Sequence, residues 1–214
     1  MKLHLRLFLF TIVAVAISPT VDAAPVTVEA DFTGGLYGAF NVKYEAAPAG
    51  LQLQSVKFDL PSSLYTDTTF APPGALLPLS FFAYGGVGAT GFSGVLGAVD
   101  GSHSFTLLFS GFDAGEEFSF NLDIDGPCGG FLCTPGAITL GSEFAGTVVT
   151  ATFGGNAYEA ASLVGSFSST GLLTANAEIS GDVTAAPEPS TLGLLGGGFV
   201  LLWASAERRG RLHA

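Results

Sequence analysis

The sequence predicts an all-β domain, an antiparallel β-sandwich that is jelly-roll-like, and three observations lead to this class. Apolar and polar residues alternate with a period of two in several interior segments. These segments are short and are separated by Gly, Pro, Ser and Asp. Helical periodicity of useful length is absent. Together these features predict about ten short strands joined by Gly-rich turns.

The clearest alternation lies in segment 116–125. Acidic and amide residues alternate there with Phe118, Phe120, Leu122 and Ile124. Successive side chains of a strand point to opposite faces of the sheet. We therefore expect the apolar side chains on a core face and the acids, including Asp123 and Asp125, in solvent.

Other segments repeat this period with local variations. Segment 51–60 slips by one residue, which predicts a β-bulge near Ser55. Segment 62–78 contains three prolines and predicts a long surface loop. Further strands are predicted at 25–32, 36–45, 77–84, 91–99, 102–109, 143–153, 157–167 and 172–180.

The N-terminal residues 1–23 have the pattern of a secretory signal peptide. Lys2 and Arg6 precede an apolar run at 7–17, and small residues allow cleavage after Ala23, with Ala24 as the alternative position. The run is too short to span a bilayer comfortably. We expect removal by signal peptidase; a buried N-terminal helix is the alternative.

The C-terminal residues 186–214 combine three features in order. The triplet Pro187-Glu188-Pro189 prevents a helix from continuing into it. The apolar run 192–206 would span roughly 22 Å as a helix, against a bilayer core of about 30 Å. Basic residues follow at Arg208, Arg209 and Arg211 and place the extreme C-terminus in the cytoplasm. The pattern predicts a marginal membrane helix over 190–206.

These three features resemble the PEP-CTERM sorting signal of Gram-negative bacteria. The resemblance covers about residues 187–211 and implies recognition by an exosortase and removal of the tail near the triplet. It also implies a final place at the cell surface or in an exopolysaccharide-containing matrix. Segment 112–125 is similar to stretches in uncharacterised PEP-CTERM ectodomains, which carry no known activity. An ordinary single-pass tail anchor is the alternative.

Removal of both ends would leave one domain at 24–185 with a strongly acidic composition. Its only lysines or arginines are Lys43 and Lys57, against 15 carboxylates, which gives a net charge of −13. Such a charge disfavours nucleic acid and anionic lipid as partners.

Cys128 and Cys133 are the only cysteines and lie close together in a Gly- and Pro-flanked segment. In an exported protein this pattern favours a local disulfide. A redox or zinc role is the alternative, although C-x-x-C spacing and other ligand candidates are missing.

The densest group of acids includes Asp113, Glu116, Asp123 and Asp125. Calcium prefers oxygen ligands, so these residues are the candidates for a calcium site. The favoured interpretation is the solvated face of a strand, because no calcium-loop motif accompanies them. A pair of glycosidase carboxylates is a further alternative. No metal or cofactor is predicted.

His103 is the only histidine of residues 24–185 and shares the alternating phase of Phe105 and Leu107. This phase favours a hydrogen-bonded histidine in the core or at its edge. A single histidine cannot build a multi-histidine metal centre, and no motif marks a catalytic triad.

The sequence therefore predicts a non-enzymatic, exported protein with a structural or adhesive role in the cell envelope or extracellular matrix. A lectin-like carbohydrate-binding module that recognises exopolysaccharide, with calcium assistance, is the alternative. Most of the 19 phenylalanines lie in core phase, and Trp203 lies in the tail, which disfavours sugar stacking on exposed rings. An enzyme is the third hypothesis.

Overall fold

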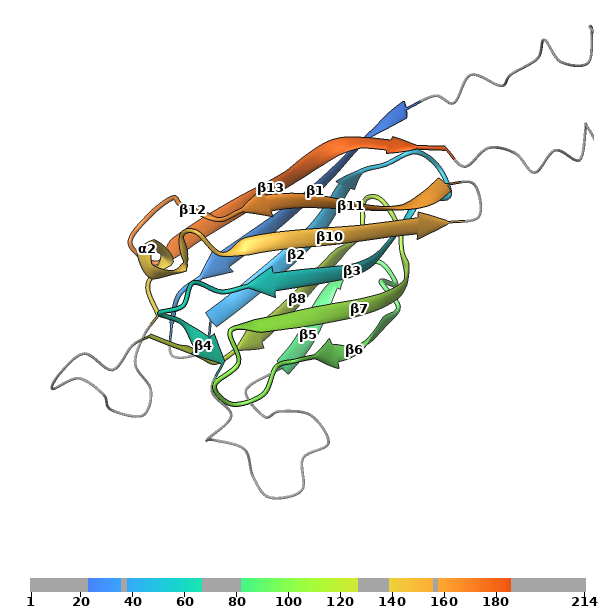
Figure 1. Cartoon of the computed structure of the whole chain (residues 1–214). Coiled ribbons are helices and arrows are strands. Elements are labelled where there is room, and N and C mark those ends of the chain that lie inside the picture. Colours follow the sequence, from blue (N-terminus) through green and yellow to red (C-terminus); the bar gives the residue numbers. More distant parts are fainter. Residues whose placement is uncertain (1–22, 36–37, 67–81, 127–138, 156–157, 186–214) are drawn as a thin grey trace, which may run out of the picture. The chain divides into compact units, whose positions relative to one another are not determined.

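Two antiparallel sheets form most of the computed structural model, which describes residues 23–35, 38–66, 82–126, 139–155 and 158–185 (Figure 1). The larger sheet has six strands in the order β12–β13–β1–β2–β8–β5. Its strands are β1 (Ala23–Thr33), β2 (Gly38–Ala46), β5 (Phe82–Val87), β8 (Glu117–Leu122), β12 (Ser168–Ser169) and β13 (Thr174–Thr184).

The smaller sheet has five strands in the order β11–β10–β3–β7–β6. Its strands are β3 (Gln52–Asp59), β6 (Phe92–Leu96), β7 (Ser104–Phe112), β10 (Val148–Gly155) and β11 (Tyr158–Ser166). A two-stranded sheet pairs β4 (Tyr65–Thr66) with β9 (Ile124–Asp125), and a short helix α2 spans Gly141–Phe144. The predicted all-β class with antiparallel pairing is confirmed.

The predicted bulge is also confirmed and lies at Gln54. The pairing of β3 with β10 passes from Ser55↔Thr152 to Leu53↔Phe153, so Gln54 has no partner in the ladder. The extra residue lets both Leu53 and Val56 point into the core, where neither is exposed.

Three expectations about local structure are corrected. The strand predicted at 143–153 begins only at Val148, because residues 141–144 form α2. The strand predicted at 116–125 is interrupted at Asp123, where the chain leaves β8 and forms β9. The predicted surface loop at 62–78 contains buried residues near its start: Leu64 and Thr66 are fully buried.

Pairing with distant segments explains the buried start of that loop. The Thr66 hydroxyl donates a hydrogen bond to the Val99 carbonyl at 2.5 Å, and the Thr66 amide donates to the Ser102 carbonyl at 2.9 Å. These bonds and the pairing of β4 with β9 satisfy backbone groups that water would otherwise solvate. Residues 67–78 lie outside the described part of the chain.

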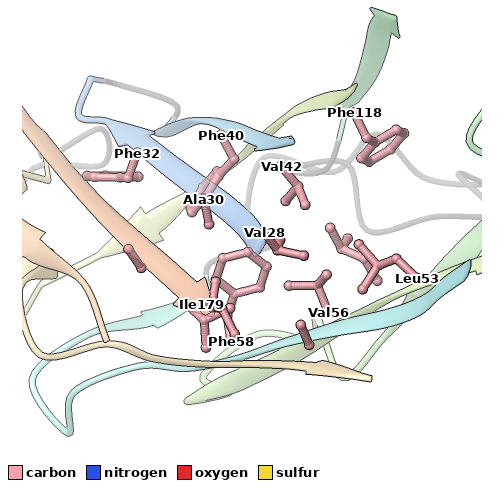
Figure 2. Close-up of a cluster of buried hydrophobic side chains, with 14 of the residues drawn as sticks. Val28, Ala30, Phe32, Phe40, Val42, Leu53, Val56, Phe58, Phe118 and Ile179 are labelled. Carbon is pink, nitrogen blue, oxygen red and sulfur yellow. The ribbon is translucent and has the colours of Figure 1, made fainter. Parts of the chain in front are cut away.

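Aromatic side chains fill the space between the two sheets. Phe40 of the six-stranded sheet lies 4.7 Å from Phe120 and 5.8 Å from Phe58 of the opposite sheet, measured between ring centroids. Figure 2 shows Phe40 and Phe58 in the same cluster as Val28 and Ile179. The phenylalanines in core phase thus form the interior that the alternation predicts.

One side of the sandwich closes where β11 lies beside β13. After β11, Phe167 is buried and β12 pairs with β13, so the chain passes from the smaller to the larger sheet at this residue. A Cβ atom at Gly165 would lie 2.7 Å from the Glu178 carbonyl oxygen. Only glycine fits this approach without displacing the backbone.

The first and last strands of the described chain are neighbours inside the larger sheet. Eleven consecutive pairs join β1 and β13, from Ala23↔Thr184 to Thr33↔Thr174. Because β1 also pairs with β2, the six-stranded sheet is complete only when the C-terminal strand has joined. Residues 23–184 form one compact unit.

Candidate functional site

The four candidate calcium ligands lie at the two ends of β8. Asp113 and Glu116 precede this strand, whereas Asp123 and Asp125 follow its last residue. Six residues of strand separate the pairs by about 20 Å. Among the residues that the structure describes, no group of three or more His, Cys, Asp or Glu side chains could hold a metal ion. The structure therefore does not bring the four residues into one site.

Glu116 stabilises the turn between β7 and β8 through hydrogen bonds. Its carboxylate accepts hydrogen bonds from the Asp113 amide at 2.9 Å and from the Ala89 amide, close to the end of β5, at 2.8 Å. Its own carbonyl accepts a bond from the Tyr44 amide of β2 at 3.0 Å. Glu116 thus connects three segments through hydrogen bonds, and these contacts are structural.

Loss of this carboxylate should destabilise the domain. We expect Glu116→Ala to lower the free energy of unfolding by about 1–3 kcal/mol, because two backbone amides lose a charged acceptor. Urea unfolding followed by circular dichroism measures the change. The matched control is Glu159→Ala, at an exposed position of β11, which should change stability by less than about 0.5 kcal/mol. Equal stabilities of the two variants would contradict the structural role of Glu116.

Asp123 is only 4% exposed, which corrects its expected place on the solvent face. The alternation of β8 stops at Leu122, and the two residues after Asp123 pair with β4 through Thr66↔Ile124 and Tyr65↔Asp125. The Thr139 hydroxyl also donates a hydrogen bond to the Ile124 carbonyl. This change of partner turns the Asp123 side chain inward. The alternation within one segment could not predict this burial.

His103 directly precedes β7 and is exposed, so its expected place on an apolar face is wrong. Its Nδ1 atom lies 2.6 Å from the Leu64 carbonyl oxygen, and its own carbonyl accepts a bond from the Leu60 amide at 2.8 Å. The histidine is therefore hydrogen-bonded, and it contacts both ends of segment 60–64.

The outer face of the larger sheet carries an acidic surface that sequence reasoning missed. We call it the acidic face. It consists of Glu29, Asp31, Lys43, Glu45, Glu117 and Glu178. Direct register partners form a row across four strands, in the order Glu178, Glu29, Lys43, Glu117. The alternation shows that each side chain points outward, but the strand partners come from distant parts of the chain.

The electrostatics of the acidic face reflect its excess of carboxylates. Lys43 forms an ion pair with Glu45, and the Asn41 amide donates a hydrogen bond to Glu117. Partial burial, followed by the charge of Glu117, raises the pKa of Asp31. Partial burial, followed by the charge of Glu45, raises the pKa of Glu29. The Glu29 and Asp31 carboxyl groups therefore hold a proton more readily than isolated carboxylates would.

The outer face of the smaller sheet has a different chemistry. Hydroxyl side chains are common on it, namely Ser55, Thr106, Thr150, Thr152 and Ser162, and the exposed Val148 and Val164 lie among them. Its one lysine, Lys57, forms an ion pair with Asp59 at 2.7 Å. Both sheets thus present extended, mainly polar faces, which are suited to non-covalent contact with large partners.

Several predicted residues lie outside the described part of the chain. These are Cys128, Cys133, Pro187, Glu188, Pro189, Arg208, Arg209 and Arg211, together with the signal peptide 1–22 and the expected membrane segment 190–206. Within the described ranges, no helix has the length and apolar character needed to cross a membrane. Comparison with family models, with curated proteins and with solved structures found no match to this chain.

Proposed function

We propose that this chain is an exported, non-enzymatic protein of the cell envelope or extracellular matrix, with a structural or adhesive role linked to exopolysaccharide or biofilm. The observation that supports this role best is the use of polar groups within the fold. Glu116 and His103 hold turns, and Lys43 and Lys57 are in ion pairs. The described residues present two broad, mainly polar faces outward rather than a set of converging reactive groups.

The export route is part of the same proposal. The compact unit at 23–184 differs by one residue at each end from the ectodomain predicted at 24–185. Signal peptidase would release the N-terminus, residues 190–206 would anchor the chain transiently in the membrane, and an exosortase would remove the tail.

Direct passages between the sheets, such as β2 to β3 and β7 to β8, support a jelly-roll-like connectivity.

A lectin-like module that recognises exopolysaccharide is the second candidate. Sugar rings are commonly held by stacking on exposed aromatic side chains. Every aromatic side chain whose burial the structure describes is buried or half-buried. The hydroxyl-rich face of the smaller sheet would then have to bind sugar through hydrogen bonds, so the structural or adhesive role ranks first.

Mass spectrometry of the native C-terminus tests the export proposal. Protein from the extracellular matrix should lack the residues after about Pro189, because cleavage near the triplet releases the domain. Replacement of Pro187, Glu188 and Pro189 by alanine should leave the chain uncut through Arg211 and in the membrane fraction. The matched control places three alanines at Ser168, Ser169 and Thr170, which lie outside the triplet and should leave cleavage intact. Recovery of the unaltered chain uncut, from cells with an active exosortase, would refute the sorting hypothesis.

A further inference from the structure

A β-bulge places Glu45 beside Glu29 on the acidic face. The pairing of β1 with β2 passes from Val28↔Tyr44 to Thr27↔Ala46, so Glu45 is the extra residue. A bulge re-aims the side chain of the residue that it leaves outside the ladder. Glu45 acts on Glu29 both through its charge and through a side-chain hydrogen bond. Two carboxyl groups therefore meet at one point of the sheet surface.

Every strand near this pair adds charge, and most of it is negative. Glu29 has Glu178 of β13 and Lys43 of β2 as its direct cross-strand partners. Asp31 lies two residues further along β1, and Glu117 of β8 lies opposite Lys43. Lys43 is the one cation of this group and is already paired with Glu45. Like charges across neighbouring strands destabilise a sheet, so the surroundings of Glu29 make its protonation easier than that of an isolated carboxyl group.

We propose that the Glu29 carboxyl group, which the bulge sets beside Glu45 on the acidic face, takes up a proton that makes the folded domain more stable in mildly acidic surroundings than at neutral pH. That proton replaces the repulsion between the two carboxylates by a hydrogen bond. The bulge makes this contact a property of the folded sheet, because the unfolded chain does not hold the two side chains together. The inference depends only on the domain and not on the proposed export.

The direction of the effect follows from proton linkage. Burial and then the charge of Glu45 raise the pKa of Glu29 above its ordinary value, so the folded state binds this proton more tightly than the unfolded state. Stability therefore rises as the pH falls through the folded-state pKa, and the gain is complete below the unfolded value. Lys43 stays charged throughout, since its hydrogen bond to Glu45 raises its pKa.

Urea unfolding of the full chain in mild detergent, at low ionic strength, tests the proposal. Between about pH 7 and about pH 5 the ratio of folded to unfolded protein should rise severalfold. Glu29→Gln imitates the protonated carboxyl group and should reduce this rise to the share that Asp31, whose pKa is also raised, contributes. At about 1 M salt the rise should shrink, because the charges of the acidic face are screened.

A matched variant distinguishes an effect of Glu29 and Glu45 on stability from an effect of the net charge of the domain. Glu159→Gln removes one negative charge from an exposed position of β11, on the other sheet, and should keep the full rise. Net charge alone would make the two variants behave alike, and that result would overturn the proposal. A wild-type stability that is unchanged or lower at about pH 5 would overturn it as well.

Discussion

Phe40→Ala is expected to be among the most destabilising single substitutions in the domain, lowering the free energy of unfolding by about 3–5 kcal/mol. The Phe40 ring is 2% exposed and lies within 6.0 Å of the rings of five others, measured between centroids. These neighbours come from both sheets and from α2; they are Phe32, Phe58, Phe105, Phe120 and Phe144. The substitution removes the ring that contacts both layers and leaves a cavity. The hydrogen-bonded strands on both sides prevent this cavity from collapsing.

A loss of this size is a large part of the total stability of a domain, which is typically about 5–15 kcal/mol. Urea unfolding at neutral pH measures it. Phe92→Ala provides the comparison, because Phe92 is half-buried at the edge strand β6 and part of its surface is already in water. We expect it to cost about half as much as Phe40→Ala. If the two substitutions cost the same, Phe40 does not join the layers as described.

Local periodicity explains why the class of fold could be predicted. The alternation in β1 and β8, and in parts of β3 and β7, places an apolar side chain on every second position, and the burial of these residues follows that pattern. The slip near Ser55 is also local, since two residues between Leu53 and Val56 cannot keep the phase of a regular strand. Each of these signals lies within a few consecutive residues.

Features that depend on distant segments could not be predicted in this way. The outward positions of Glu29 and Glu45 follow from alternation, but their meeting requires the pairing of β1 with β2 and its bulge. Asp123 turns inward because β9 pairs with β4, which lies about 60 residues earlier in the chain. The helix α2 has four residues, too few to show a helical period.

The helix α2 also shows how tertiary contact decides a local choice. Phe144 of α2 is fully buried and stacks on Phe32, with 4.1 Å between ring centroids. The Leu140 amide donates a hydrogen bond to the Glu143 carboxylate at 2.8 Å, which satisfies a backbone group at the start of the helix. The aromatic contact and the local cap together favour one helical turn where the apolar pattern alone predicts a strand.

The second large effect is expected at the C-terminal strand, where Ile179→Asp should prevent the six-stranded sheet from forming. Ile179 is fully buried, pairs with Val28 of β1, and belongs to the core cluster (Figure 2). A carboxylate at this position would lose its hydration without gaining a partner, at a cost of several kcal/mol. Because β13 is an interior strand of its sheet, its loss would also uncover the inner surface of β1.

Ser180→Asp is the matched control, since it adds the same charge one residue further along the strand. Ser180 is exposed and its register partner is Thr27, so the new carboxylate would point into solvent. We expect Ser180→Asp to change the free energy of unfolding by less than about 1 kcal/mol. Circular dichroism and limited proteolysis would show an unfolded Ile179→Asp chain beside a folded Ser180→Asp chain. The reverse result would mean that β13 pairs with β1 one residue out of the described register, because such a slip moves every side chain to the other face.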